Sequence, residues 1–246
     1  MDSGYYAACT ALKTQSNVLE LVANNVANVN TAGYRGELPT FESLLVQTER
    51  SGQSNGWSHL LNEFAVLNGS RLDMTEGNLE RTGNPLDLAL EGPGFFAVQT
   101  KAGTLYTRNG SLQISKTGQL VTSAGDPVLG AAGPITLPLN AEPAISPDGT
   151  ISIAGAVAGK VRLVEFAPGT QLSAVGGAYY SAPPKSETTA VHTTMQQGMI
   201  ESSNVNPVAA VIQLISAQRE AEMVGRAMNA FYSDFNRIAA DELPRV

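Results

Sequence analysis

The chain has 246 residues, of which 22 are acidic and 15 are basic, so its formal net charge is −7. A surface that binds nucleic acid needs clustered lysines and arginines, and because the basic residues here are scattered, the sequence argues against nucleic acid as a partner. The chain has no run of about 20 apolar residues, which predicts no membrane insertion.

The first predicted element is a long helix over residues 3–29. One stripe of mostly apolar side chains recurs along it at alternating steps of three and four, which is typical of a seam that faces a partner helix. The stripe consists of Tyr5, Ala8, Leu12, Gln15, Leu19, Val22, Val26 and Val29. Gly33 follows and suits the left-handed backbone position that ends a helix. Residues 1–4 contain neither a basic region nor an apolar run, so we expect no conventional signal peptide.

A weaker helical pattern follows over residues 37–47. It rests on the spacing of Leu38, Phe41, Leu44 and Leu45. The polar residues after it, 50–57, are typical of a loop. Together these features indicate a connector over residues 36–85.

The middle of the chain is predicted to be β-rich, most clearly over residues 86–166. Short β-like runs are separated there by turn pairs, namely Ala102-Gly103, Asn109-Gly110 and Asp148-Gly149. The Asn-Gly pair is the strongest short hairpin signal among them. Strands at spacings of about ten residues without intervening helices favour an antiparallel sandwich or barrel-like domain. Residues 182–194 are predicted to be an extended connector.

The last predicted element is a helix that begins after Asn206, which suits a helix cap, with Pro207 in its first turn. It runs to about Asp241. It carries a second stripe with the same alternating spacing, formed by Leu214, Ala217, Ala221, Val224, Met228, Phe231, Phe235 and Ile238.

These elements predict an α+β protein, in which an antiparallel all-β central domain is flanked by N- and C-terminal coiled-coil-forming helices that pair with each other. The expected division is residues 1–35 with 200–246 as the terminal helical domain, 36–85 as the connector, and 86–199 as the β-rich domain with an extended connector at its end.

No pattern in the sequence indicates catalysis. The run from Gly92 to Ala97 has the spacing of a dinucleotide-binding loop, but a β-like run follows it where the pyrophosphate would need a helix. The chain has one cysteine and two histidines, His59 and His192. A metal site needs three or four converging ligands, so carboxylates would have to complete it, and the sequence does not indicate which ones. We therefore expect no enzyme activity, no metal and no cofactor.

Three stretches of the sequence resemble the bacterial flagellar rod and hook proteins. They are ANNVANVNTAGYR at residues 23–35, GNPLDLALEGPGFF at 83–96 with YTRNGS at 106–111, and SNVNPV at 203–208 with AQR at 217–219. The family motif lies at Asn24, Asn25, Asn28, Asn30, Gly33, Tyr34, Asn204, Asn206 and Pro207.

This resemblance implies a structural subunit of the flagellar basal-body rod, most similar to a proximal-rod subunit, that assembles through its terminal helices and transmits torque. It also implies export through the flagellar type III apparatus without a cleaved signal peptide, which accounts for the start of the chain. The implied partners are adjacent proximal- and distal-rod proteins, further copies of the chain, and the export apparatus. The implied location is the periplasmic rod of the basal body.

Two alternatives stay open at this point. The distal-rod and hook proteins share the same motifs, so the chain could be one of these paralogues. An alternative of another class is a secreted β-domain that binds glycan or peptidoglycan, which predicts clustered exposed aromatic side chains on the β-domain.

Overall fold

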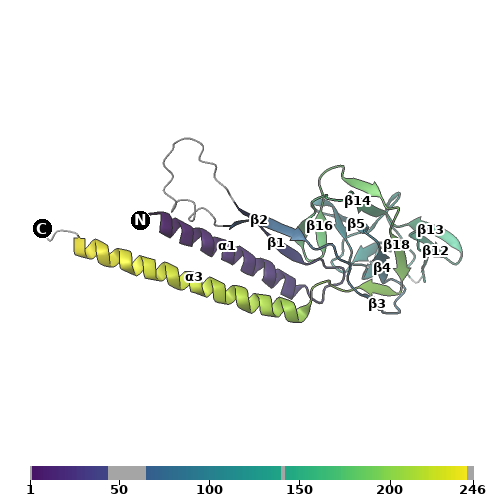
Figure 1. The fold of residues 1–246 in the computed structure, drawn as a ribbon. Coiled ribbons are helices and arrows are strands. Elements are labelled where there is room, and N and C mark those ends of the chain that lie inside the picture. Colours follow the sequence, from purple (N-terminus) through teal and green to yellow (C-terminus); the bar gives the residue numbers. More distant parts are fainter. Residues whose placement is uncertain (1, 44–64, 140–141, 243–246) are drawn as a thin grey trace. The chain divides into compact units, whose positions relative to one another are not determined.

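The computed structural model describes residues 2–43, 65–139 and 142–242. They fall into two compact units, which we call the helical unit and the β unit (Figure 1). The helical unit consists of Met1–Val26, Glu37–Ser70 and Pro207–Val246, and the β unit consists of Ala27–Gly36 and Arg71–Asn206. In the described part of the chain, no helix has the length and apolar character that crossing a membrane requires.

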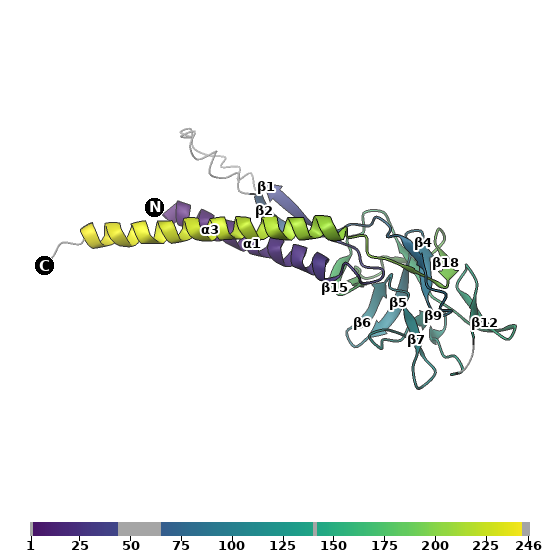
Figure 2. The same ribbon diagram turned by 90° about the horizontal axis from the view of Figure 1, so that it is seen from below.

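The helical unit contains both terminal helices. Helix α1 spans Asp2–Ala27 and helix α3 spans Pro207–Glu242. They lie side by side and run in opposite directions (Figures 1 and 2). The start of α3 at Pro207 confirms the prediction. Proline suits the first turn, because an N–H at that position would have no carbonyl partner within the helix. Strands β1 (Glu37–Ser43) and β2 (Ala65–Leu72) form a two-stranded sheet.

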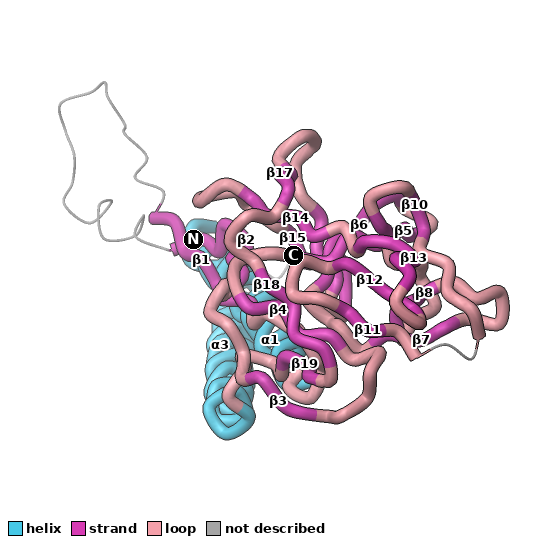
Figure 3. Tube along the Cα trace, turned by 90° about the vertical axis from the view of Figure 1, so that its right-hand side faces the viewer, coloured by secondary structure: helices cyan, strands magenta, loops and turns pink. Residues whose placement is uncertain are grey.

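The β unit contains the remaining described strands, coloured magenta in Figure 3. They are β3 (Leu79–Arg81), β4 (Leu88–Glu91), β5 (Phe95–Thr100), β6 (Gly103–Thr107), β7 (Leu112–Ile114), β8 (Leu120–Thr122), β9 (Leu129–Gly130), β10 (Gly133–Pro134), β11 (Ala144–Ile145), β12 (Thr150–Ile153), β13 (Ala156–Lys160), β14 (Leu163–Phe166), β15 (Ser173–Gly176), β16 (Tyr179–Ser181), β17 (Glu187–Thr189), β18 (Thr194–Gln197) and β19 (Met199–Glu201).

The largest sheet has six strands in the order β15-β16-β6-β5-β14-β17, and all its pairings are antiparallel. The β unit also contains smaller antiparallel sheets, namely β11-β12-β13, β18-β4, β19-β3, β7-β8 and β10-β9. The antiparallel β-rich middle is therefore confirmed. The segment predicted as a plain connector over residues 182–194 also contributes β17 to the edge of the six-stranded sheet, so that prediction was incomplete.

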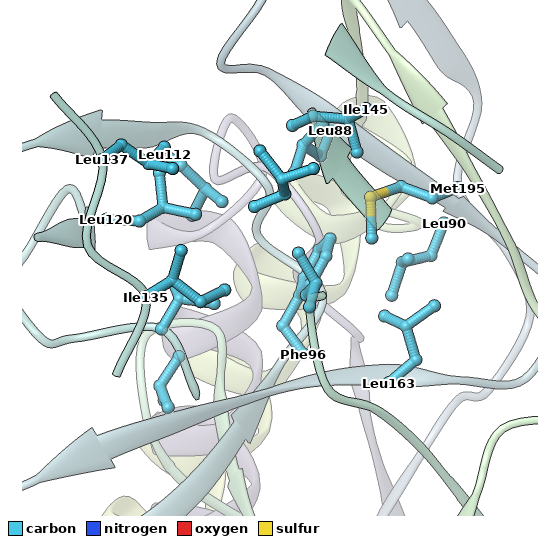
Figure 4. Packing of buried hydrophobic residues seen from close by; sticks show 14 residues of the cluster. Leu88, Leu90, Phe96, Leu112, Leu120, Ile135, Leu137, Ile145, Leu163 and Met195 are labelled. Atoms are coloured by element: carbon cyan, nitrogen blue, oxygen red, sulfur yellow. The ribbon is translucent and has the colours of Figure 1, made fainter. Parts of the chain in front are cut away.

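Two hydrophobic clusters lie on opposite faces of strands β5 and β14. Side chains of a strand alternate between its faces, and Phe96 belongs with Leu163 to one cluster whereas Phe95 belongs with Val164 to the other. Figure 4 shows the first cluster, where Leu88 and the other labelled side chains surround Phe96. Burial of both faces explains why the Phe95–Val98 run is apolar without alternation.

Two predictions of local structure were wrong. Residues 37–43 form strand β1 instead of the start of a helix, and residues 44–47 lie outside the described part. The spacing of Leu38 and Phe41 fits a helix, but Pro39 has no N–H for a helical hydrogen bond and is tolerated in an edge strand. Pairing with β2, which follows much later in the chain, then decides the conformation.

The Asn109-Gly110 pair does not form a two-residue hairpin. Strand β6 pairs with β5 and β16, whereas β7 pairs with β8 in another sheet. Gly110 is not among the glycines with positive φ. Glycine at position 110 instead lets the backbone approach the backbone of Leu88 closely. The Gly110 carbonyl accepts a hydrogen bond of 2.9 Å from the N–H of Leu88, and a Cβ at position 110 would overlap the Leu88 carbonyl.

We expect Gly110→Ala to destabilise the β unit by about 2 kcal/mol or more, because the overlapping atom belongs to the backbone and cannot rotate away. Gly159→Ala is the matched control: Gly159 also lies in the β unit without positive φ, and its nearest neighbour to a new Cβ is the Ile135 side chain at 3.9 Å. Thermal unfolding followed by circular dichroism measures both variants. Equal melting temperatures would contradict the close approach.

Candidate functional site

The described residues of the predicted seam lie on the protected side of their helices. In α1, Val22 is 6% exposed, and Leu12, Gln15, Leu19 and Val26 are half-buried. The amide Nε2 of Gln15 donates to the Ala217 carbonyl in α3 over 3.1 Å, so this face of α1 contacts α3.

One seam residue lies elsewhere. Val29 follows the end of α1 and belongs to the β unit, so the helical part of the first stripe ends at Val26. The predicted helix extended to residue 29 because the apolar spacing continues, but the chain leaves the helix after Ala27 and forms a turn closed by a 3.1 Å hydrogen bond from the Thr31 N–H to the Asn28 carbonyl.

Helix α3 protects a single narrow stripe. Between Val208 and Ala230 the side chains that are not exposed, besides Gly225, are Ala210, Leu214, Ala217, Ala221, Val224 and Met228, at alternating steps of four and three. The remaining predicted seam residues, Phe231, Phe235 and Ile238, lie outside the residues whose side chains the structure describes. The first half of this stripe is rich in alanine, so the helices can approach closely there but bury little apolar surface.

Within the helical unit, Asn25 from the family motif fixes the beginning of β1. Its side-chain amide donates to the Glu37 carbonyl over 2.8 Å and its side-chain oxygen accepts from the Glu37 N–H over 2.9 Å. A strand neighbour would make the same two bonds, so the side chain satisfies both backbone groups of the first residue of β1. Asn25 is 7% exposed, whereas Asn24 and Asn30 are exposed.

In the β unit, a buried carboxylate connects three segments that are distant in sequence. We call Arg35, Arg108 and Glu201 the ion cluster. Glu201 is fully buried, and its Oε1 lies 2.7 Å from Arg35 Nη2 while its Oε2 lies 2.7 Å from Arg108 Nε. Oε1 also accepts the Gly77 N–H over 2.9 Å, and the Glu201 carbonyl accepts the Gly33 N–H over 2.7 Å.

The two arginines of the ion cluster differ in how their N–H groups are satisfied. Arg108 also donates to the carbonyls of Leu90, Gly92 and Gly94 over 2.7–3.0 Å. Arg35 approaches Glu201 without hydrogen-bond alignment, and among the described residues its Nε and Nη1 have no hydrogen-bond partner. Burial lowers the pKa of Arg108, Glu201 opposes this, and Arg35 reinforces it. Two buried guanidinium groups thus share one carboxylate as their ion-pair partner.

Asn204, another residue of the family motif, holds two neighbouring segments beside the ion cluster. Its side-chain oxygen accepts the Gly36 N–H over 2.7 Å, and its amide donates to the carbonyls of Asp73 and Thr75 over 2.9 and 3.0 Å. The Arg35 N–H donates to the Tyr180 hydroxyl over 2.7 Å, and burial raises the pKa of that hydroxyl, which keeps its proton.

Of the motif residues, Asn25 and Asn204 therefore bind backbone groups with their side chains. Gly33 has φ of +66° and is packed against the backbone of Arg108, where a Cβ would overlap, so glycine is required there. Tyr34 is 2% exposed, Asn206 is exposed and Pro207 opens α3. Sequence reasoning found these residues by resemblance but missed Glu201 and Arg108 as their partners, because charged residues so far apart in the sequence carry no local signal.

Among the described residues, no group of three or more histidine, cysteine, aspartate or glutamate side chains lies close enough to hold a metal ion. The geometry described above consists of a helix seam and a set of structural hydrogen bonds. Such an arrangement packs the two terminal helices together and holds distant segments of the chain in place.

Comparison with known proteins finds three matching family descriptions. Residues 6–35 match the flagella basal body rod protein family, residues 89–153 match the flagellar hook protein FlgE/F/G D1 domain, and residues 196–233 match the C-terminal domain of the flagellar basal body rod FlgEFG proteins. Each matched segment contributes one member of the ion cluster.

The chain is also similar along most of its length to curated proteins. It is 36% identical over 245 residues to the flagellar basal-body rod protein FlgF of Escherichia coli, with 91% of each chain covered. It is 33% identical to the FlgF protein of Caulobacter vibrioides, with both chains covered completely. It is 30% identical to the rod protein FlgG of Bacillus subtilis, with 87% of this chain and 89% of the relative covered.

Proposed function

The chain belongs to the flagellar basal-body rod protein family, and we propose that it is a proximal-rod subunit that assembles through its two terminal helices. Membership makes it a structural subunit of the rod, located in the flagellar basal body, that assembles with other rod subunits. Similarity to several proteins named FlgF supports this proposal. The alternative within the family is a distal-rod or hook paralogue, and proteins named FlgG are also similar to the chain.

The observation that carries the assembly proposal is a second apolar surface on α3, away from its seam. We call it the outer patch; it consists of Val208, Val211, Ile212 and Ile215. Their exposed fractions are 70%, 45%, 59% and 46%. At 100° per residue these four positions fall within one third of the helix circumference, and the seam lies outside that arc. A contiguous exposed apolar patch marks an interaction surface, and a second α-helical subunit suits a helix face of this kind.

The seam that pairs α1 with α3 is proposed to be a coiled coil within one subunit, with the outer patch facing a neighbour. An interface in which one surface meets a different surface of the next copy can repeat without closing, which produces a helical filament such as a rod. The helical unit would then be the assembly domain, and we propose that torque passes between neighbouring subunits through it.

Export through the flagellar type III apparatus without a cleaved signal peptide is part of the same proposal. It rests on family membership. A structural subunit of this kind needs neither catalysis nor a cofactor, and we propose none.

The glycan-binding alternative has less support. It predicts clustered aromatic side chains on the surface of the β unit. In the part of the β unit that the structure describes, the large exposed apolar side chains are Met74, Leu139, Val157, Val175 and Val191, and none is aromatic. No specific observation therefore favours a carbohydrate ligand.

We expect the double variant Ile212→Glu with Ile215→Glu to abolish incorporation into the rod. Both side chains are exposed in the subunit, so the isolated protein keeps its fold, but two charges in the outer patch would be desolvated at an interface. Gln213→Glu is the control, because Gln213 is exposed on the same helix outside the patch. Basal bodies purified from a complemented deletion strain are probed for the subunit. Wild-type incorporation of the double variant would show that the outer patch is not an assembly surface.

A further inference from the structure

The seam between α1 and α3 contains one polar residue with a specific set of contacts. Gln15 occupies a seam position between Leu12 and Leu19. Its Nε2 donates to the backbone carbonyl of Ala217 over 3.1 Å and to Oε2 of Glu220 over 3.0 Å. Both acceptors lie on α3, so a single amide group is held by two points of the opposite helix.

The side chain opposite Gln15 makes this contact possible. Ala217 is 5% exposed and has only a methyl group, so α1 can approach the α3 backbone closely enough for a side chain to reach a main-chain oxygen. In the protected stripe of α3, the next residue, Ala221, and the residue one heptad earlier, Ala210, are also alanines, whereas Leu214 lies between Ala210 and Ala217. A shift of one heptad in one direction places Ala210, another alanine, opposite Gln15. The size of the opposing side chain alone therefore distinguishes poorly between these two registers at this point of the seam.

We propose that Gln15 is a positioning residue that fixes the register of α1 against α3. A heptad shift moves one helix along the other by about 10 Å, which separates Gln15 from Ala217 and Glu220. The position of the Glu220 carboxylate is then taken by Gln213, which is neutral, or by Ala227, whose side chain has no acceptor, so the charge-assisted hydrogen bond is lost in either direction. A single polar residue in a helix seam selects one register at a cost in stability. The proposal concerns pairing within one subunit and holds whether or not the outer patch binds a second copy.

Chemical cross-linking of the purified full-length chain tests the register. All reporters carry Cys9→Ala and Leu12→Cys. In antiparallel helices with Gln15 opposite Ala217, position 12 lies opposite position 221, because it precedes Gln15 by three residues and 221 follows Ala217 by four. Ala221→Cys therefore reports the native register, and Leu214→Cys and Met228→Cys report shifts of one heptad in either direction. The probe is a short rigid bis-maleimide, and intramolecular products are identified by mass.

With Gln15 present, we expect the 12–221 pair to be the main cross-linked product. Gln15→Leu is expected to keep the helices, as followed by far-ultraviolet circular dichroism, but to lose the preference of the 12–221 pair over the two shifted pairs. Gln15→Lys is expected to retain the preference, since an ammonium group donates to the same two oxygens. Gln15→Glu is expected to lose it, because a carboxylate would face the Glu220 carboxylate.

Several outcomes would overturn the proposal. One is an unchanged preference for the 12–221 pair in Gln15→Leu, which would show that the apolar seam sets the register alone. Others are loss of helix in Gln15→Leu, loss of preference in Gln15→Lys, and failure of the 12–221 pair to form with Gln15 present. Because the assay uses the isolated chain, these outcomes are distinct from failure of the outer patch in rod incorporation.

Discussion

Glu201→Gln is expected to destabilise the β unit by about 3–5 kcal/mol, because it removes the carboxylate that pairs with two buried guanidinium groups. The attraction of Asp73 for Arg35 and of Glu76 for Arg108 then remains. Arg35 and Arg108 are each 1% exposed, so water cannot replace the lost carboxylate. The change keeps the size of the side chain and removes only its charge. For a folding unit of this size, the expected fall in melting temperature is about 6–20 °C.

Arg35 provides a test of the charge balance in the ion cluster. Arg35→Met removes the guanidinium whose Nε and Nη1 have no hydrogen-bond partner among the described residues, and leaves Arg108 paired with Glu201. We expect this variant to cost less than Glu201→Gln. In the Glu201→Gln background, Arg35→Met should be nearly neutral or stabilising, since it removes one of two unpaired buried charges.

The control for Glu201→Gln is Glu187→Gln, which breaks the ion pair with Arg162 at the surface of the same unit. That pair is about one third exposed, and a partly exposed pair contributes about 1 kcal/mol or less. Thermal and urea unfolding of the four variants give the required free energies of unfolding. Equal losses for Glu201→Gln and Glu187→Gln, or independent effects of Arg35 and Glu201, would contradict the charge argument.

The terminal helices could be predicted from sequence because their signal is local and repeated. The three–four spacing through Leu12, Leu19 and Val22 appears on the protected side of α1, and the alternating positions from Leu214 to Met228 are the protected positions of α3. The turn signals at Ala102-Gly103 and Asp148-Gly149 were also local, whereas Asn109-Gly110 does not form the hairpin that it favours. Gly103 and Gly149 both have positive φ at the hairpins where they were expected.

The ion cluster could not be predicted because its members meet only in the folded chain. Arg35 follows α1, Arg108 follows β6 and Glu201 ends β19, and no periodicity relates their positions. Residue type alone predicts that all three side chains are exposed, since arginine and glutamate are rarely fully buried. The same reason explains the wrong prediction for residues 37–43, where pairing with a distant strand outweighs a short helical pattern.

A charge in the helix seam is expected to abolish rod assembly without unfolding the β unit. Val22 is 6% exposed on the face of α1 that contacts α3, so Val22→Asp places a carboxylate in an apolar interface at a cost of several kcal/mol. The seam is weak, because Ala217 and Ala221 bury little surface and Gln15 is polar. The free energy of pairing between the helices is therefore too small to offset this cost. We expect unpaired helices and no incorporation into the rod.

The β unit should be unaffected by Val22→Asp, because its two hydrophobic clusters are formed by residues outside α1 and α3. Ala23→Asp is the matched control: it adds the same charge at the next position of α1, which is exposed. Swimming and isolated basal bodies report assembly, and thermal unfolding of the purified chains reports the β unit. Normal motility of the Val22→Asp strain would refute the seam, since a carboxylate at that position can be tolerated only where α1 stays in contact with water.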